Sequence, residues 1–277
     1  MTLRTEALQS LKETSRTFYI PIRQLPDGLL EAVSSAYLCL RAIDEVEDHP
    51  ELDNATKAML LRRISLNLQA ATEDPSAESF SEGLHGQQYN LPDVSLRIGE
   101  WAALAPATIA PRIWDATAAM ADRMAHWAEC NWRIETESEL NQYTFSVAGS
   151  VGLLLSDLWA WFDGTQTDRS LAIGFGRGLQ AVNILRNQSD DLTRGANFFP
   201  TGWDRDRMHA YSKRNLSLAD AYTRQLAPGP ILDFCKIPLT LAHGTLQAMA
   251  LGDLKLSRAR VMQLIEQVMG SKVPKLD

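Results

Sequence analysis

Two stretches of the sequence place oxygen-bearing side chains at spacings that suit metal-assisted chemistry. The first is LRAIDEVEDHP, residues 40–50, in which Asp44 and Asp48 follow an apolar run. Because successive helical residues turn by about 100°, Arg41, Asp44 and Asp48 share one helical face. Two carboxylates one turn apart repel each other by roughly a few tenths of a kcal/mol unless a cation bridges them. Mg²⁺ suits such a pair, since it takes oxygen ligands and binds substrate phosphates.

The second stretch is GFGRGLQAVNILRNQSDDLTRGANFFP, residues 174–200, and it repeats this spacing. Amide and carboxylate side chains follow steps of three, four and four along one helical face, at Gln180, Asn183, Asn187 and Asp191. Arg186 and Arg194 flank that face. An antiparallel arrangement would let the two helices face each other across a cleft. The spacing therefore predicts a paired metal site with ligands on both helices.

Each stretch also has an ordinary interpretation. An acidic cluster such as 44–48 is often a solvated helix face, and an Asn/Asp ladder alone is no stronger a signal. Both ladders nevertheless lie within very apolar helices, where unpaired polar groups are costly, and this favours the metal site. The glycines of GFGRGLQ suggest a dinucleotide-binding loop, but no strand precedes them, so we reject that interpretation.

The elements that must position these ladders are helices, because strand signals are almost absent. Apolar periodicity predicts helices at 2–14, 27–47, 54–72, 91–104, 107–133, 137–162, 168–191, 215–227, 231–251 and 255–270. Prolines that should stop helices fall between these segments, at Pro26, Pro50, Pro92, Pro106, Pro200 and Pro230. The predicted N-caps and C-caps are Asp53, Asp93, Thr136 and Ser217, and Gly164 and Gly252. The longest predicted loop is 73–90, and no linker or repeat divides the chain, so we expect one all-α domain over 1–277.

Composition limits the classes of function. The formal net charge of −7 argues against a nucleic-acid partner. Three widely separated cysteines, Cys39, Cys130 and Cys235, predict reduced core thiols and a cytoplasmic protein. The N-terminus carries no apolar signal region, and the apolar stretch 147–162 is short for a membrane span, so any membrane contact is expected to be peripheral. A monomer and a homodimer both fit this composition.

Five motifs, in this order, resemble those of the squalene/phytoene synthase family. They are SRTFY (15–19), RAIDEVED (41–48), YTFSVAGSVG (143–152), LQAVNILR (179–186) and DLTRGANFFP (191–200). The resemblance implies an all-α isoprenoid-synthase helical bundle around a central apolar cavity. It also implies Mg²⁺-dependent head-to-head condensation of two prenyl diphosphates, farnesyl or geranylgeranyl. The reaction would pass through a cyclopropyl-carbinyl diphosphate to a squalene- or phytoene-type product.

The same resemblance implies roles for individual residues. The metal ligands would be Asp44, Asp48, Asn183, Asn187 and Asp191. The diphosphates would lie near Ser15, Thr17, Arg41, Arg186 and Arg194. Catalytic groups at the reaction centre would be Tyr143, Arg41 and Gln180. A dry wall for the carbocation would be formed by Phe18, Tyr37, Phe145, Val147, Ala148, Val151 and Leu154, for each of which plain core packing is the alternative.

The sequence departs from the family pattern at two points. The second metal motif begins with Asn187 where the family has aspartate, and a neutral amide oxygen is a poorer ligand for Mg²⁺. The segment 238–258 lacks the tyrosine found in many members and offers only His243. Two alternatives therefore stay open: a single-step or terpene-cyclase-like enzyme that ionises one prenyl diphosphate, and a non-catalytic prenyl-lipid-binding homologue. Product chain length, and NADPH as a reductant, are also left open by the motifs.

Overall fold

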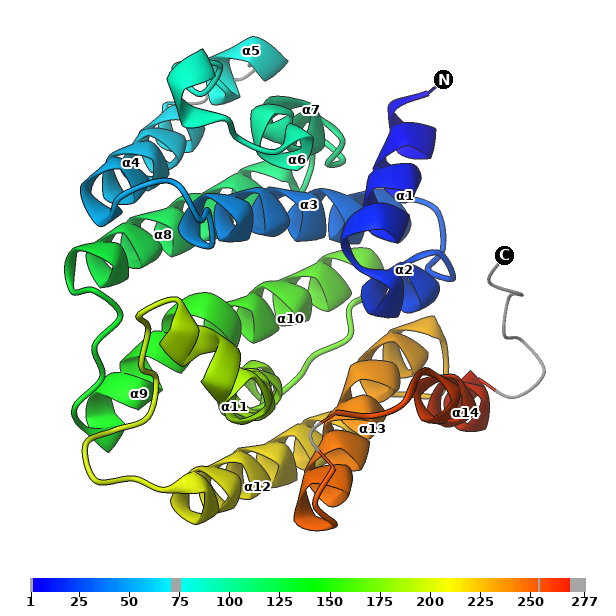
Figure 1. Ribbon diagram of the computed structural model, residues 1–277. Coiled ribbons are helices and arrows are strands. Elements are labelled where there is room, and N and C mark those ends of the chain that lie inside the picture. The colour runs from blue at the N-terminus through cyan, green and yellow to red at the C-terminus, as the bar shows by residue number, and fades with distance from the viewer. Residues whose placement is uncertain (1, 71–75, 254, 270–277) are drawn as a thin grey trace. The chain divides into compact units, whose positions relative to one another are not determined.

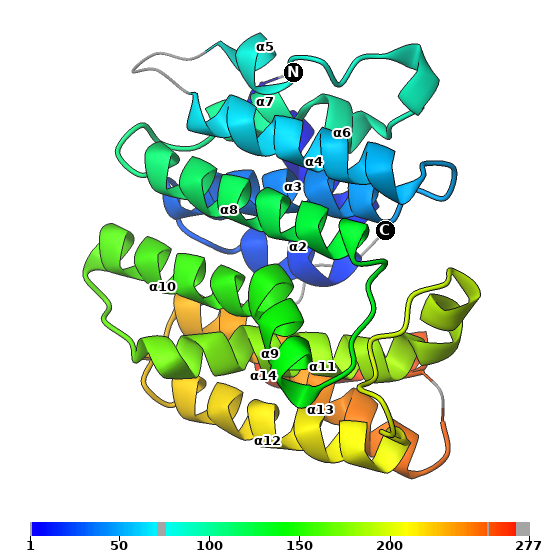
Figure 2. The ribbon, with the colours of Figure 1, turned by 90° about the vertical axis from the view of Figure 1, so that its left-hand side faces the viewer.

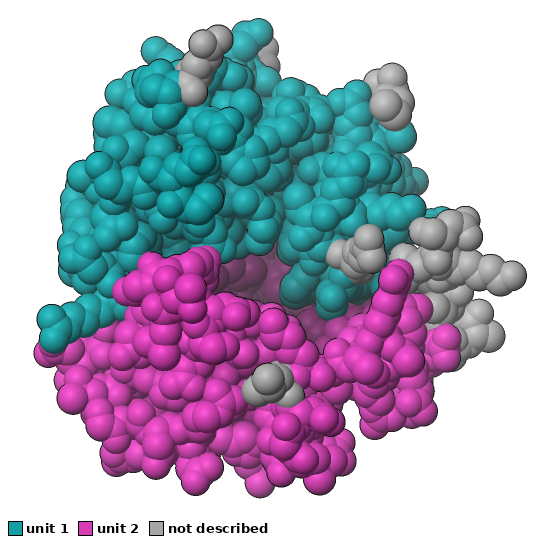
Figure 3. Space-filling view, in the orientation of Figure 1, with its two compact units in different colours: residues 1–133 teal, residues 134–277 magenta. Residues whose placement is uncertain are grey.

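The computed structural model describes residues 2–70, 76–253 and 255–269, and within these residues it contains helices and no strands. The chain divides into two compact units, Met1–Arg133 and Ile134–Asp277, which are coloured separately in Figure 3. The all-α architecture predicted from the sequence is confirmed. One domain over residues 1–277 stays a prediction.

Unit 1 is built around the helix that carries the first acidic ladder (Figure 1). This helix is α3, Leu29–Glu47, and it packs against α1, α2, α4, α6, α7 and α8. The other helices of unit 1 are α1 (Leu3–Thr14), α2 (Arg16–Ile22), α4 (Asn54–Gln69), α5 (Ala77–Phe80), η1 (Gln87–Tyr89), α6 (Asp93–Leu96), α7 (Ile98–Ala103) and α8 (Ala110–Glu129). Leu38 and Ile43 of α3 are completely buried, so the core of the unit fixes the orientation of this helix.

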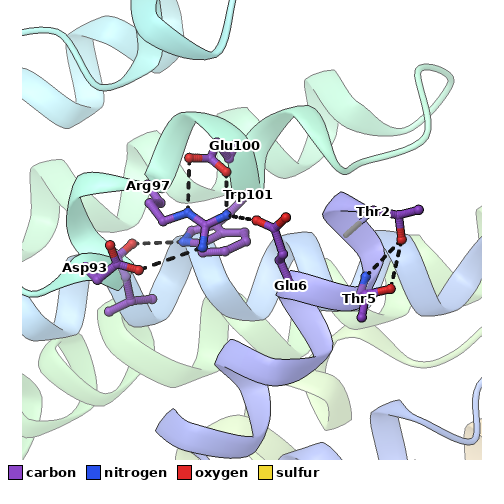
Figure 4. A network of polar contacts seen from close by, with 8 residues as sticks. Thr2, Thr5, Glu6, Asp93, Arg97, Glu100 and Trp101 are labelled. Carbon is purple, nitrogen blue, oxygen red and sulfur yellow. Dashed lines mark hydrogen bonds and ion pairs between the residues drawn. The ribbon is translucent and has the colours of Figure 1, made fainter.

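Arg97 links α1 to the α6–α7 segment within unit 1 (Figure 4). Its guanidinium donates to Glu6 of α1 at 2.5 Å and to Glu100 of α7 at 2.5 Å. It also lies over the ring of Trp101, 4.4 Å from the centroid. The hydrogen bond with Glu100 raises the pKa of Arg97, against the opposing effect of burial, and the bond with Glu6 adds to the rise. This network fixes α1, and therefore Ser15, which follows directly after its last residue.

Unit 2 is built in the same way around the helix that carries the second ladder. This helix is α11, Arg169–Thr193; it packs against α9, η2, α10, α12 and α13, and Figure 2 shows it running alongside α12. The other elements are α9 (Glu137–Thr144), the π-helical turn η2 (Phe145–Gly149), α10 (Ser150–Asp163), α12 (Arg205–Thr223), α13 (Pro230–Ala250) and α14 (Arg258–Met269). Within the described residues, the continuous segment Glu137–Asp163 is the one stretch long and apolar enough, by length and composition alone, to cross a membrane.

Glycines let α11 approach η2 and α10 unusually closely. A Cβ atom at Gly176 would lie 2.0 Å from the carbonyl oxygen of Ala148, and one at Gly152 would lie 2.0 Å from that of Ala172. Backbone therefore packs directly against backbone along this seam, where no side chain larger than hydrogen fits. Of the glycines of GFGRGLQ, Gly176 serves this contact, while Gly174 and Gly178 allow α12 to approach closely on another side. All three lie within α11 and form no loop, as the sequence indicated.

Several predicted elements differ from the observed ones. The predicted helix 91–104 is divided at Arg97 into α6 and α7, and 137–162 is interrupted by η2. The helix predicted from residue 215 begins ten residues earlier, at Arg205. The predicted loop 73–90 contains α5 and η1, and its first residues, 73–75, lie outside the described part of the chain.

The predicted helix caps are partly confirmed. The side chains of Asp53 and Thr136 accept hydrogen bonds from the first turns of α4 and α9, and Gly164 ends α10 with a left-handed backbone. Ser217 is wrong as an N-cap, because it lies inside α12, where its hydroxyl donates to the carbonyl of Lys213. The caps predicted at Asp93 and Gly252 are each one residue late, since Pro92 and Leu251 take those positions.

Candidate active site

The candidate site residues of unit 1 lie at the C-terminal end of α3. Asp44 lies in the last turn, and Asp48 caps the helix while its backbone N–H still donates to the carbonyl of Asp44, at 2.8 Å. The two carboxylates therefore keep the one-turn spacing predicted for them. Arg41 precedes them by one turn and donates from Nη2 to Glu45. Its Nε is buried and has no hydrogen-bond partner among the described residues, so this guanidinium retains a donor for an anionic ligand.

Electrostatics make Asp44 the unusual member of this group. Burial is the main cause that raises its pKa to about 7; Arg41 opposes the rise, while Asp48 and Glu45 add to it. A carboxylate that is costly to ionise beside two other acids is stabilised by a bound cation. For Arg41, burial lowers the pKa, but Glu45 and Asp44 outweigh that effect, so its pKa is raised overall and it stays charged.

The segment that links α1 to α2 carries the predicted Ser15 and Thr17. The Ser15 hydroxyl accepts a hydrogen bond from the backbone N–H of Phe18 and so caps α2, while Thr17 is half-buried in the first turn of that helix. The rings of Phe18 and Tyr37 are 5.4 Å apart, which brings two predicted wall residues together within unit 1. Burial raises the pKa of Tyr37, and a hydrogen bond with Ser15 works against that rise.

The candidate site residues of unit 2 lie along α11. Asp191 is the buried member of the ladder, with 8% of its side chain exposed, and it accepts a bond from Nη2 of Arg194 at 2.7 Å. Asn187 accepts from Nε of Arg186 at 3.1 Å. Gln180 is half-buried. Two predicted diphosphate-binding arginines therefore contact two predicted metal ligands.

Tyr143 lies against the segment that follows α11. Its ring is 96% buried and stacks on Phe198, with centroids 4.6 Å apart and planes inclined by 19°. Phe198 and Phe199 also line a narrow crevice beside Asp191. The motif DLTRGANFFP thus supplies aromatic faces next to the second ladder. The sequence pattern assigns no role to Phe198, whose only signal is its place a few residues after that ladder.

The predicted wall residues of unit 2 differ in exposure. The half-buried ones are Phe145, Val147, Ala148 and Val151. Leu154 is only 1% exposed and belongs to the core of the unit, so its place in a cavity wall stays a prediction. Phe145, Val147 and Ala148 all lie in the π-helical turn η2, so an irregular segment of helix carries most of this wall. Such turns occur frequently at functional sites.

The predicted metal ligands form a separate group in each unit. Among the described residues, no three His, Cys, Asp or Glu side chains gather in one metal-binding group. Two predicted ligands, Asp44 and Asp48, lie at the C-terminal end of α3, and three lie on α11, of which Asn183 and Asn187 are asparagines. The oxygen-bearing side chains of each group, the raised pKa of Asp44 and the unpartnered Nε of Arg41 fit a divalent cation that binds a diphosphate.

Solved structures share this fold. The chain superposes on TcSQS in complex with the ligand BPH1237 with a TM-score of 0.77, at 21% identity, covering 96% of this chain and 86% of that one. A dehydrosqualene synthase in complex with a ligand gives a TM-score of 0.62 at 18% identity, covering 96% and 95%. The fold is therefore the all-α isoprenoid-synthase fold that the resemblance implied.

Sequence comparison defines the family. Residues 11–209 match the family described as squalene/phytoene synthase. The squalene synthase of Schizosaccharomyces pombe is 29% identical over 273 residues, covering 87% of this chain and 58% of that protein. That of Homo sapiens is 27% identical over 268 residues, covering 86% and 61%. The chain belongs to the squalene/phytoene synthase family, and it spans about three-fifths of the length of these curated relatives.

Proposed function

We propose that this protein is a prenyltransferase that condenses two prenyl diphosphates head to head. Membership of the squalene/phytoene synthase family supports this reaction. The observation that carries the proposal is that α3 and α11, the central helices of the two units, each end in oxygen ligands accompanied by arginines. A prenyl diphosphate has a highly charged leaving group on an apolar chain, and its ionisation needs that combination of groups.

Each unit would contribute metal ligands. Asp44 and Asp48 of unit 1 would bind Mg²⁺, and Asn183, Asn187 and Asp191 of unit 2 would also bind Mg²⁺. Bound Mg²⁺ would supply a Lewis acid that neutralises the diphosphate as its bond to carbon breaks. Arg41, Arg186 and Arg194 would bind the diphosphate oxygens through charge-assisted hydrogen bonds.

The apolar residues would act on the hydrocarbon part of the substrate. The faces of Tyr143 and Phe198 would lie against the developing carbocation, because aromatic rings attract cations without reacting as nucleophiles do. The half-buried side chains of η2 would exclude water from it. In the first half-reaction, one diphosphate and one proton would leave as the cyclopropyl-carbinyl diphosphate forms. Its ionisation would release the second diphosphate.

Asn187 favours a second candidate function. In this alternative the enzyme ionises a prenyl diphosphate without completing both half-reactions. The Asn187 side chain is neutral and its oxygen is engaged by Arg186 at 3.1 Å, so this ladder offers a single carboxylate, Asp191, at its three ligand positions. Fewer carboxylates bind Mg²⁺ more weakly and lower the driving force for ionisation.

The test is incubation with farnesyl diphosphate and, separately, geranylgeranyl diphosphate, with Mg²⁺, and with or without NADPH. Diphosphate release is followed together with mass spectrometry of the lipid extract. A C30 or C40 product, or its cyclopropyl diphosphate, supports head-to-head condensation. Release with only C15 or C20 products supports the second candidate. If neither farnesyl nor geranylgeranyl diphosphate yields free diphosphate, both candidate reactions are refuted. The non-catalytic prenyl-lipid-binding alternative then remains.

A variant and its control assign the metal site in the same assay. Asp44→Asn should abolish diphosphate release, because the amide removes the charge that holds Mg²⁺. Asp115→Asn is the matched control, since Asp115 lies on α8 with 77% of its side chain exposed. An unchanged rate in Asp44→Asn would remove Asp44 from the metal site.

A further inference from the structure

The helix that carries Tyr143 is interrupted directly after it by the π turn η2, where the backbone N–H of Ser150 bonds to the carbonyl of Phe145, five residues before. Hydroxyl side chains support this irregular segment by bonding to carbonyls one turn back. Thr144 donates to Leu140 at 2.7 Å, Ser146 to Gln142 at 2.8 Å, and Ser150 to Ser146 at 3.0 Å. Ser and Thr bond to helix carbonyls in this way and commonly bend the helix.

Arg177 holds the start of this turn from the neighbouring helix α11. Its Nη2 donates to the backbone carbonyl of Asn141 at 3.2 Å, and its Nε donates to the hydroxyl of Thr144 at 3.3 Å. Both acceptors are neutral, and no carboxylate among the described residues forms an ion pair with Arg177. The charged guanidinium strengthens both hydrogen bonds, because a charged donor bonds more strongly than a neutral one.

Tyr211 of α12 contacts the same two residues of α9, Asn141 and Thr144, that Arg177 contacts from α11. Its hydroxyl donates to Oδ1 of Asn141 at 2.9 Å and lies 3.3 Å from the hydroxyl of Thr144. The residue is 99% buried, and burial raises its pKa, so the phenol stays a neutral donor. Residues from α9, α11 and α12 therefore meet at the N-terminal edge of η2. We call this group, Arg177, Asn141, Thr144 and Tyr211, the Arg177 clamp.

We propose that Arg177 is a positioning residue that keeps η2 in its π-helical form and thereby sets the orientation of Tyr143 for the condensation. This inference rests on the proposed function. If the turn relaxed to a regular α-helix, residues before it would rotate by about 100° relative to those after it. Tyr143 would then lose its stacking on Phe198, while Val151 would stay in place.

A misplaced Tyr143 should slow the second half-reaction, in which the cyclopropyl diphosphate is converted to the final product. Loss of the stacked ring misplaces the wall against which the second carbocation forms, and a displacement of about 1 Å can cost about 100-fold in rate. We expect Arg177→Met to raise the ratio of cyclopropyl diphosphate to final product by about tenfold or more. The kcat for the final product should fall, while the KM for the prenyl diphosphate should change by less than about twofold, since the Arg177 guanidinium is engaged by Asn141 and Thr144.

Three further variants separate positioning from general destabilisation. Arg177→Lys keeps the charge but loses the two-point contact, so its product ratio should fall between those of the wild type and Arg177→Met. Tyr211→Phe removes only the hydroxyl from the clamp, and it serves if Arg177→Met does not fold. Arg169→Met is the matched control, because Arg169 also lies on α11 and bonds to α10 through Asp157, at 2.5 Å, but does not contact the clamp.

Hydrogen exchange followed by mass spectrometry gives a readout independent of activity. Amides in residues 141–150 should exchange about tenfold faster in Arg177→Met and faster in Tyr211→Phe, and at the wild-type rate in Arg169→Met. Faster exchange together with the shifted product ratio supports the inference. Unchanged exchange in this segment overturns it, and so does an unchanged product ratio. If the wild type releases no diphosphate, the proposed function fails, and the exchange comparison alone decides whether Arg177 holds the turn.

Discussion

Replacement of Asp44 by asparagine should make the Mg²⁺-free protein more stable at the pH where the enzyme would work. The folded-state pKa of Asp44 is raised from 3.8 to about 7, mainly by burial. A carboxyl group with a raised folded-state pKa binds its proton more tightly in the folded state than in the unfolded state. Its contribution to stability is therefore complete below about pH 4, is lost between about pH 4 and pH 7, and stays lost above pH 7.

The size of this loss follows from the pKa. A rise from 3.8 to about 7 corresponds to about 4 kcal/mol at full strength. Because Asp44 is only half-buried and solvent weakens the effect, we expect about 1–2 kcal/mol at pH 8. Asp44→Asn carries no charge at any pH and avoids that loss. Its melting temperature at pH 8 should therefore exceed that of the wild type by roughly 2–6 °C.

Thermal unfolding at pH 4 and pH 8 in the presence of a chelator measures the effect, with Asp115→Asn as control. The advantage of Asp44→Asn should disappear at pH 4. Mg²⁺ at 100 times its dissociation constant should then stabilise the wild type by about 2.7 kcal/mol, and Asp44→Asn much less. The reasoning is refuted if the variant has no advantage at pH 8, if the advantage is equal at pH 4, or if Mg²⁺ stabilises both proteins equally.

Three further perturbations test other contacts. Gly176→Ala places a methyl group 2.0 Å from the Ala148 carbonyl oxygen and should lower the free energy of unfolding by about 1–3 kcal/mol. The control Gly244→Ala, whose Cβ would clash only with the movable end of Leu264, should lower it less. Equal losses in the two variants would contradict the close backbone packing at Gly176. Arg97→Gln should lower the free energy of unfolding by about 2 kcal/mol and speed proteolysis of α1, because it leaves Glu6 and Glu100 unpaired; Arg62→Gln, which breaks an exposed pair with Glu129, should cost clearly less, and equal losses would contradict this account. Asn187→Asp should tighten Mg²⁺ binding by about tenfold, measured as metal-dependent thermal stabilisation; unchanged affinity would argue that residue 187 is not a ligand.

The predictable parts of the fold and site are those that depend on spacing along one helix. Helical periodicity placed Asp44 with Asp48, and Asn187 with Asp191, on single faces of α3 and α11. It did so because apolar residues at three- and four-residue steps fix which face is buried. The residue types then indicated oxygen ligands and arginines at the ends of both helices.

The parts that escaped prediction depend on contacts between helices. The first turns of α12 are mostly polar, so residues 205–214 carry no continuous apolar stripe, and they are helical because Met208 and Tyr211 are buried against neighbouring elements. The π turn lies within a long, mostly apolar helical pattern and is stabilised from outside by Arg177. Helix α2 contains Pro21 and is too short to show a period. The stacking of Phe198 on Tyr143 joins residues 55 positions apart, which no local pattern reveals.

The seam of glycines between α11 and the η2–α10 segment has a consequence for how this protein can diverge. Where two backbones touch directly, neither helix can move closer, and any new side chain forces both apart. We therefore expect the size of the substrate that fits to change through side chains outside the glycine contacts, such as the half-buried Val147 and Val151. The spacing between α11 and the η2–α10 segment would be inherited unchanged while those side chains are exchanged.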